Sequence, residues 1–226
     1  MLVSAERGYE IWAETYASEP NPILALESRT LARLLASQQP KRVLDIACGT
    51  GRWSLHFRQL GADVIGLDAS QPMLAQAAKQ TSLNGFLVHA TADALPIRSN
   101  VADLILCSMS LGYFPKLRDV FGEFARTAAA GATIVISDLH PAAIAAGWTR
   151  SFKKDGRKFE IEHQSHTLAG IEDAGRRAGL QMTLSHTAYF DDSDVASFRA
   201  AGREAILAKV RETPALLITI WKKTCF

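Results

Sequence analysis

The stretch Val43-Leu44-Asp45-Ile46-Ala47-Cys48-Gly49-Thr50-Gly51 runs from a short apolar strand into small residues and then into a segment of helical period. Gly49 and Gly51 permit a tight turn, and without a Cβ atom they let a ligand approach the backbone closely. The N–H groups at the start of the following helix are free to meet a carboxylate or a phosphate. We therefore predict a ligand-binding turn at the carboxyl edge of an open α/β sheet.

The alternation of strand and helix extends outward from this turn over residues 41–137. Short, continuous apolar runs are typical of strands buried on both faces, and we expect such strands at 42–47, 63–67, 86–89, 103–107 and 133–137. Between them we predict helices at 51–60, 70–82 and 117–129, the second with Ser70 as its N-cap. This pattern predicts a doubly wound, Rossmann-like α/β fold with a mostly parallel sheet and helices on both faces.

The flanking segments add elements to this sheet. Residues 23–37 and 167–178 have helical spacing. Strand-like patterns at 180–190 and 215–221 bring the sheet to seven strands, and the amphipathic segment between them, 193–212, is predicted to be one helix. Because the chain has no repeat, low-complexity tract or linker, we expect residues 1–226 to form a single domain.

Composition argues against several classes of protein. The formal net charge is +2, from 25 basic and 23 acidic side chains, which gives no field that would indicate a nucleic-acid partner. Cys48, Cys107 and Cys225 are too few and too scattered for a disulfide framework, so we expect a cytoplasmic protein. No stretch approaches the roughly 20 apolar residues that span a bilayer, and the N-terminus has no apolar signal core, so we expect no membrane partner.

Asp68 ends the second predicted strand, downstream of the glycine turn. An acidic side chain at that position can accept both hydroxyl hydrogens of a ribose. Together, the turn and Asp68 indicate a cofactor that contains adenosine. The alternative interpretation is a bare tight turn followed by an aspartate that caps a helix.

These motifs resemble those of the class I S-adenosylmethionine-dependent methyltransferases, in particular the type 11/25-like group of small-molecule and quinone-biosynthesis enzymes. In that family the first strand ends in an acid-x-Gly-x-Gly-x-Gly loop, which Asp45 to Gly51 match with Ala47 in place of the first glycine. The family's ribose-binding acid matches Asp68, and the apolar residue that packs on adenine matches Met73. Its adenine-reading acid matches Asp93. The resemblance also implies that the last strand of the sheet is antiparallel.

The resemblance implies that S-adenosyl-L-methionine is the cofactor and S-adenosyl-L-homocysteine the product, and that the Ala94 N–H reaches the adenine ring. The N-terminal Tyr9-x-x-Trp12-Ala13-x-x-Tyr16 is similar to the group's aromatic signature, with Glu10 and Ala17 at the two aspartate positions. The implied cofactor contacts are Tyr9, Tyr16, Asp45, Ala47, Cys48, Gly49, Gly51, Asp68, Ala69, Met73, Ala92, Asp93, Ala94, Ser108 and Met109.

The N-terminal aromatic residues also have a physical reason to lie near this cofactor. A sulfonium is a cation, so the faces of aromatic rings attract it while they keep water from the reacting methyl group. We favour this role for Tyr9 and Tyr16. For Trp12, an ordinary apolar stripe on a helix is an almost equally good interpretation.

Methyl transfer from a sulfonium chiefly requires alignment of the acceptor, and a base helps only where the acceptor must lose a proton. His140, after the fifth predicted strand, is our leading base candidate. Tyr113 is a candidate for orienting the acceptor, and His166 lies at the far end of a predicted insertion, 141–166, that resembles a substrate lid. For each histidine, a structural hydrogen-bonded imidazole is an equally good interpretation. No residues show convincing metal-ligand spacing, so no metal is expected.

The first functional hypothesis is an enzyme that moves a methyl group to an O, N or C atom of a small-molecule acceptor, with residues 1–40 as a helical cap. The alternatives are a catalytically silent cofactor-binding partner and a non-methyl use of the same cofactor. An NAD-dependent oxidoreductase is a further alternative. Its fingerprint requires a third glycine that lets the helix pack closely on the strand, but this sequence has Trp53 and Ser54 there. We expect a monomer or a homodimer.

Overall fold

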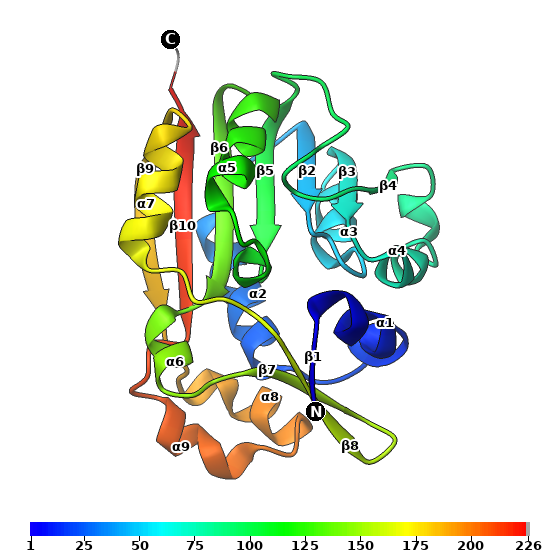
Figure 1. Ribbon diagram of the computed structural model, residues 1–226, viewed down its shortest axis with the longest axis vertical. Coiled ribbons are helices and arrows are strands. Elements are labelled where there is room, and N and C mark those ends of the chain that lie inside the picture. Colours follow the sequence, from blue (N-terminus) through cyan, green and yellow to red (C-terminus); the bar gives the residue numbers. More distant parts are fainter. Residues whose placement is uncertain (225–226) are drawn as a thin grey trace.

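Seven strands form the main sheet of the computed structural model, which describes residues 1–224 (Figure 1). Their spatial order is β4-β3-β2-β5-β6-β10-β9, and β10 is antiparallel to both of its neighbours while the other pairs are parallel. This confirms the predicted fold class. The strands are β2 (Arg42–Ile46), β3 (Asp63–Asp68), β4 (Leu87–His89), β5 (Ala102–Ser108), β6 (Ala128–Leu139), β9 (Leu180–Ala188) and β10 (Leu216–Lys223).

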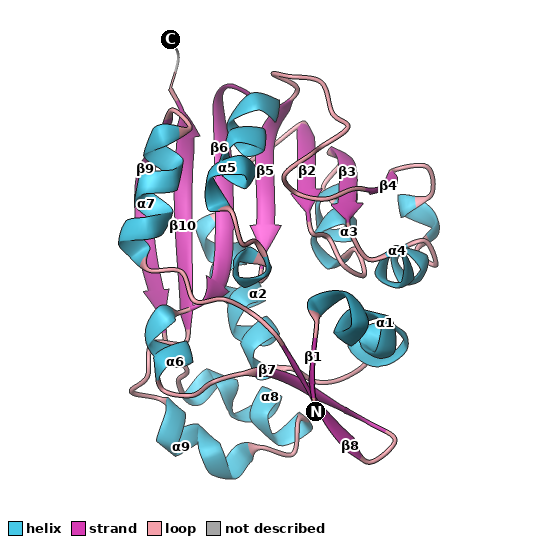
Figure 2. Cartoon of the chain, viewed as in Figure 1, coloured by secondary structure: helices cyan, strands magenta, loops and turns pink. Residues whose placement is uncertain are grey.

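Helices cover both faces of this sheet because its central strands are apolar on both sides. Alternate residues of β5 point to opposite faces: Ile105 packs in one apolar cluster with Phe121 and Phe124 of α5, and Leu104 packs in another with Leu31 of α2. Figure 2 shows α5 and α7 on the near side of the sheet and α2 behind it. The helices are α2 (Pro22–Leu34), α3 (Arg52–Gln59), α4 (Gln71–Ala77), α5 (Leu117–Thr127) and α7 (Leu168–Arg177).

The predicted helix 193–212 is wrong. The structure has a series of short turns and helices there: η3 (Asp192–Asp194), α8 (Val195–Ala200), η4 (Glu204–Ile206) and α9 (Leu207–Val210). Gly202 has φ +64°, and the Arg203 N–H donates to the Phe198 carbonyl at 2.8 Å, which closes α8 as a helix C-cap does. The predicted helix 70–82 is also shorter, because α4 ends at Ala77 and a separate turn, η1 (Thr81–Leu83), follows.

A second, smaller sheet lies beyond the carboxyl edge of the main one. It is formed by β1 (Leu2–Val3), β8 (Arg157–Ile161) and β7 (Arg150–Lys154), in that order. The segment 1–40 is therefore not purely helical as predicted, because its first residues pair with β8. The predicted insertion 141–166 begins with α6 (Pro141–Ala145) and continues as the antiparallel pair β7 and β8.

Helix α1 (Ala5–Tyr16) joins this small sheet through its aromatic face. Trp12 stacks on Phe152, with ring centres 4.6 Å apart and planes 8° apart, and Phe152 stacks on Phe159. A Cβ on Gly8 would lie 2.8 Å from Ile161 Cγ1, so the helix and β8 are in close contact there. These residues form an apolar cluster apart from the two that cover the main sheet. Within residues 1–224, no helix combines the length and apolar character needed to cross a bilayer.

Candidate active site

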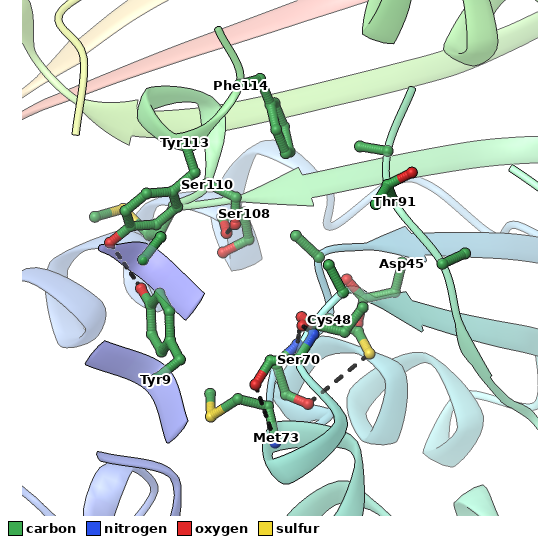
Figure 3. A pocket seen from close by; sticks show the side chains of 18 of the residues that line it. Tyr9, Asp45, Cys48, Ser70, Met73, Thr91, Ser108, Ser110, Tyr113 and Phe114 are labelled. Atoms are coloured by element: carbon green, nitrogen blue, oxygen red, sulfur yellow. Dashed lines mark hydrogen bonds between the residues drawn. The ribbon is translucent and has the colours of Figure 1, made fainter. Parts of the chain in front are cut away.

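A cavity of about 740 Å³ lies at the carboxyl ends of β2, β3, β4 and β5, against α1. Its volume is in the range of sites for small organic ligands and cofactors. In Figure 3, Tyr9 and Tyr113 lie on one side of it, opposite Cys48, Ser70 and Met73. The predicted residues in its wall are Tyr9, Tyr16, Asp45, Ala47, Cys48, Gly49, Asp68, Ala69, Met73, Ala92, Asp93, Ser108, Met109 and Tyr113.

The loop after β2 turns sharply through three left-handed residues: Ala47, Gly49 and Gly51 have φ values of 55°, 56° and 80°. Ala47 takes this conformation despite its Cβ atom, at a cost of roughly 1–2 kcal/mol. A Cβ on Gly49 would lie 3.2 Å from Met73 Cε, whereas one on Gly51 would lie 2.6 Å from Leu83 Cδ1. Gly49 therefore leaves this part of the cavity wall open. Gly51 lies outside that wall, and its lack of a Cβ atom instead allows the start of α3 to pack closely on Leu83.

Asp68 is fixed at the end of β3 by backbone N–H groups of the glycine loop and of the turn before α4. Its Oδ2 accepts a hydrogen bond from the Gly49 N–H and its Oδ1 one from the Ser70 N–H, both at 2.7 Å. Burial raises the pKa of Asp68 above its ordinary value, and the two backbone N–H groups oppose this shift. Each carboxylate oxygen has two lone pairs, so the group retains capacity to accept hydrogen bonds from a ligand's hydroxyl groups.

Asp45 is buried in the floor of the cavity. Its Oδ2 accepts a hydrogen bond of 2.6 Å from Ser54 Oγ of α3. Burial raises the pKa of Asp45 to about 7, an effect that the hydrogen bond from Ser54 opposes. Ser54 occupies the position where a dinucleotide-binding fingerprint has its third glycine, and here it positions this carboxyl group instead.

Ala94 is the other predicted cofactor contact that lies outside the cavity wall. Its N–H donates to the Thr91 carbonyl at 3.3 Å, which closes the turn after β4. The structure therefore does not support the predicted contact from this N–H to a ligand. Ala92 and Asp93 of the same turn do line the cavity.

Three tyrosines form the wall that faces the glycine loop. The hydroxyl groups of Tyr9 and Tyr113 share a hydrogen bond of 2.8 Å (Figure 3). Burial raises the pKa of Tyr16 to about 12 and also raises the pKa values of Tyr9 and Tyr113. All three are neutral phenols at physiological pH, so they exclude water and donate hydrogen bonds but supply no phenolate base. Trp12 is absent from this wall, because its ring stacks on Phe152.

The two histidine candidates do not reach this cavity. His140 is the N-cap of α6, where its Nδ1 accepts a hydrogen bond from the Ala142 N–H at 3.1 Å, and burial lowers its pKa. His166 forms a bond of 3.0 Å between Nε2 and the Phe114 carbonyl. Neither side chain is in the cavity wall, because both are turned to satisfy local backbone groups. The structure therefore does not support a base role for either residue.

The sequence analysis missed a buried polar network beneath the cavity. Glu27 of α2 has no exposed surface, and it accepts hydrogen bonds from Arg52 at 2.8 Å, Ser108 at 2.7 Å and Ser137 at 2.8 Å. Arg52 continues into the cavity wall, where it is the first residue of α3. The available signal was an acid on the apolar stripe of α2, between Leu24 and Leu31.

The cavity wall also includes His89 and three charged groups that were not predicted: Glu6, Arg52 and Lys116. The Nε2–H of His89 donates a hydrogen bond to the Ala69 carbonyl at 2.9 Å. Within the described part of the chain, no three His, Cys, Asp or Glu side chains are grouped so that they could hold a metal ion.

The comparisons agree with this architecture. A family model described as "Methyltransferase domain" matches residues 44–136. A malonyl-[acyl-carrier protein] O-methyltransferase from Buchnera aphidicola is 34% identical over 131 residues, which are 58% of this chain and 51% of that protein. A demethylmenaquinone methyltransferase from Thermus thermophilus is 32% identical over 118 residues, 50% of this chain and 54% of that protein. The chain thus spans about half the length of these curated relatives.

Solved structures extend the likeness to nearly the whole fold. A putative S-adenosylmethionine-dependent methyltransferase from Listeria monocytogenes matches 89% of this chain and 100% of its own, with a TM-score of 0.68 at 18% identity. One from Mesorhizobium loti matches 88% of this chain and 99% of its own, with a TM-score of 0.69 at 20% identity. Residues 44–136 thus match a methyltransferase-domain model, and the chain has the fold of these solved S-adenosylmethionine-dependent methyltransferases, with the glycine loop and Asp68 at the same sheet edge.

Proposed function

We propose that this protein transfers a methyl group from S-adenosylmethionine to an O, N or C atom of a small-molecule acceptor. The observation that carries the proposal is the carboxylate of Asp68, held between the N–H groups of Gly49 and Ser70 in the wall of a cavity of about 740 Å³. The names of the curated relatives, which are O-methyltransferases and quinone methyltransferases, support the same class of reaction.

The residues of the wall fit each part of this cofactor. Asp68 has lone pairs for the two ribose hydroxyls, Met73 offers an apolar surface to adenine, and Asp93 supplies an acceptor for its amine. Tyr9 and Tyr16 offer ring faces to positive charge and exclude water. Ala47, Cys48, Gly49, Ala69, Ala92, Ser108 and Met109 complete the proposed contact set.

When bound, the cofactor supplies a methyl group that its sulfonium already activates for displacement. The chain's own task is then to hold the acceptor in line and keep water away. Because Tyr9, Tyr16 and Tyr113 remain neutral phenols, the tyrosine wall favours acceptors that need no base. Tyr113 orients the acceptor through its hydroxyl group in this proposal.

The remaining expectations belong to the same proposal. The protein is a single domain that works as a monomer or homodimer in the cytoplasm, with a cap in residues 1–40 and a lid in residues 141–166. Its acceptor is a small molecule rather than a nucleic acid, which the net charge of +2 supports. Cys48 and Cys107 are free, buried thiols, as suits a reducing compartment.

Titration calorimetry with S-adenosylmethionine, S-adenosylhomocysteine and NAD tests the cofactor. The two adenosyl-sulfur ligands should bind and NAD should not. Asp68→Ala should weaken their binding at least tenfold, because a hydrogen bond to a charged group contributes about 1.5–3 kcal/mol. The control is Asp103→Ala, which removes a carboxylate that accepts hydrogen bonds from the backbone N–H groups of Lys41 and Arg42 at the opposite end of β5. This variant should leave the affinity unchanged. Binding of NAD alone, or equal affinity in the Asp68→Ala variant, would refute the assignment.

A further inference from the structure

A second cavity, of about 250 Å³, adjoins the first and has no role in the cofactor assignment. Tyr9, Tyr16, Leu24 and Met109 line both cavities, so the two chambers share a wall. The rest of the second cavity comes from the start of α2, from the chain before β7 and the first residues of that strand, and from the irregular segment around α8 and α9, with Trp12 and Leu139. Figure 1 shows α6, α8 and α9 gathered near β7 beyond the carboxyl edge of the sheet.

The body of the second cavity is apolar and aromatic. Trp148 and Phe190 stack with ring centres 6.0 Å apart, and Phe190 meets Phe198 edge-on at 4.7 Å. Leu139 and Val210 add aliphatic surface. A wall of this kind binds a ring or a branched hydrocarbon by removing apolar surface from water.

Among residues 1–224, the charged side chains in this wall are two arginines, Arg150 and Arg203, and no acid lines it. Arg150 is paired with Asp138 and donates to the Met109 carbonyl at 2.6 Å, but its Nε–H is buried without a partner. A buried donor of this kind requires an acceptor. Asp138 also accepts hydrogen bonds from the Gly112 and Leu139 N–H groups, so Arg150 is one of its three partners. Arg203, in the described part of the chain, has no ion-pair partner and leaves the cavity with net positive charge.

Arg150 lies at the side of the second cavity that faces the first. Its guanidinium is 4.8 Å from the ring centre of Tyr113, which lines the first cavity, and it bonds to Met109 in the shared wall. An anion that bonds to Arg150 therefore lies close to the chamber assigned to the cofactor. The apolar part of such an anion would then extend away from that chamber, along the wall that Trp148, Phe190 and Phe198 form.

We propose that the methyl acceptor is a small apolar carboxylic acid, bound in the second cavity with its carboxylate at Arg150, and that a carboxylate oxygen receives the methyl group. This inference rests on the proposed function. A cavity of about 150 Å³ holds one benzene molecule, so 250 Å³ has room for on the order of ten non-hydrogen atoms, the size of a one-ring acid.

The reaction balances without a base. An electron pair of the carboxylate oxygen forms the new O–CH₃ bond as the sulfur–carbon bond breaks, and the pair of the broken bond stays on sulfur. One negative and one positive charge disappear, and the products are a neutral methyl ester and a neutral thioether. No proton is taken up or released, which agrees with a site whose tyrosines are neutral and whose candidate histidines lie outside the wall.

The test compares acids with their amides. The full chain, saturated with S-adenosylhomocysteine, is titrated with phenylacetate, 3-phenylpropionate and 4-methylpentanoate, and with the amide of each. At least one acid should bind tenfold or more tightly than its amide. Arg203→Met should weaken that binding at least fivefold, whereas the control Arg176→Met, which removes an exposed arginine of α7, should not. Arg150→Lys keeps a cation for Asp138 but removes the Nε–H, and it should weaken the acid more than the amide.

Turnover with S-adenosylmethionine and the acid that binds should give a methyl ester, recognised by mass spectrometry and by its hydrolysis in alkali. Acids that bind no better than their amides, unchanged affinity in Arg203→Met, or methylation at another atom would each overturn the inference. Such a result with intact S-adenosylhomocysteine binding leaves the methyltransferase assignment standing. Failure to bind S-adenosylhomocysteine refutes the assignment itself, and the acid and amide titrations can still be made on the protein alone.

Discussion

Replacing Asp45 by asparagine should stabilise the protein at neutral and alkaline pH. Burial raises the pKa of this carboxyl from its ordinary 3.8 to about 7 in the folded protein. Between these two values the folded protein keeps a proton that the unfolded chain releases, so stability falls as pH rises through the window and is constant above it. Because one pKa unit corresponds to about 1.4 kcal/mol, the rise in pKa from 3.8 to about 7 lowers the free energy of unfolding by on the order of 4 kcal/mol above pH 7.

Asparagine cannot ionise, so the variant lacks this dependence on pH. Urea unfolding of both proteins, from about pH 4 to about pH 8, should give a stability difference that grows from near zero to a few kcal/mol in favour of the variant. The control is Asp155→Asn, because Asp155 is exposed in the turn between β7 and β8. If the free energies of unfolding of wild type and Asp45→Asn change in parallel with pH, Asp45 has the same pKa in the folded and the unfolded protein. That result would refute the argument.

Three further substitutions test the packing. Gly175→Ala places a Cβ 2.2 Å from Trp221 Cζ3, so α7 must shift from β10, and urea unfolding should show a loss of about 1–3 kcal/mol; an unchanged midpoint would contradict this contact. Gly8→Val forces α1 away from Ile161, and hydrogen exchange should become faster in β8 but not in β5; equal acceleration in both would mean that the small sheet is not a separate unit. Glu27→Ala leaves Arg52, Ser108 and Ser137 without their shared acceptor, and should lower stability by about 1–3 kcal/mol; a neutral effect in calorimetric melting would refute the network's structural role.

The main sheet could be predicted from sequence because its strands are buried on both faces and its turns carry local signals. Ser70 accepts the Met73 N–H as the predicted N-cap, and the glycine loop lies at the predicted sheet edge. The segment 193–212 could not, because Val195, Phe198, Leu207 and Val210 reach one apolar cluster from a series of short helices and turns rather than from a single helix. Phe198 is buried while Ile206 is 42% exposed, so helical spacing there did not reflect a helix.

The direction in which polar side chains point could not be predicted from the sequence either. The sequence placed His140 after the fifth strand of the prediction, at the correct edge, but its ring turns back to cap α6. No local sequence pattern marked Arg150, because its role depends on its ion pair with Asp138 of β6. Whether a polar residue faces a cavity or a backbone group is decided by tertiary contacts that spacing alone does not record.

The second cavity is built from side chains outside the two apolar clusters that hold the main sheet. Met109, Leu139, Phe190 and Phe198 belong to a third cluster, with Trp148 at its margin. None of them belongs to the two clusters that α3, α5 and α7 form with the main sheet, although Leu26 of α2 packs with them in the third. A library of variants at Trp148, Phe190 and Phe198 can therefore change the shape of this chamber while the sheet and the glycine loop keep their sequence. If the second cavity holds the acceptor, as we propose, the choice of acceptor can be redesigned at these three positions, none of which lines the first cavity.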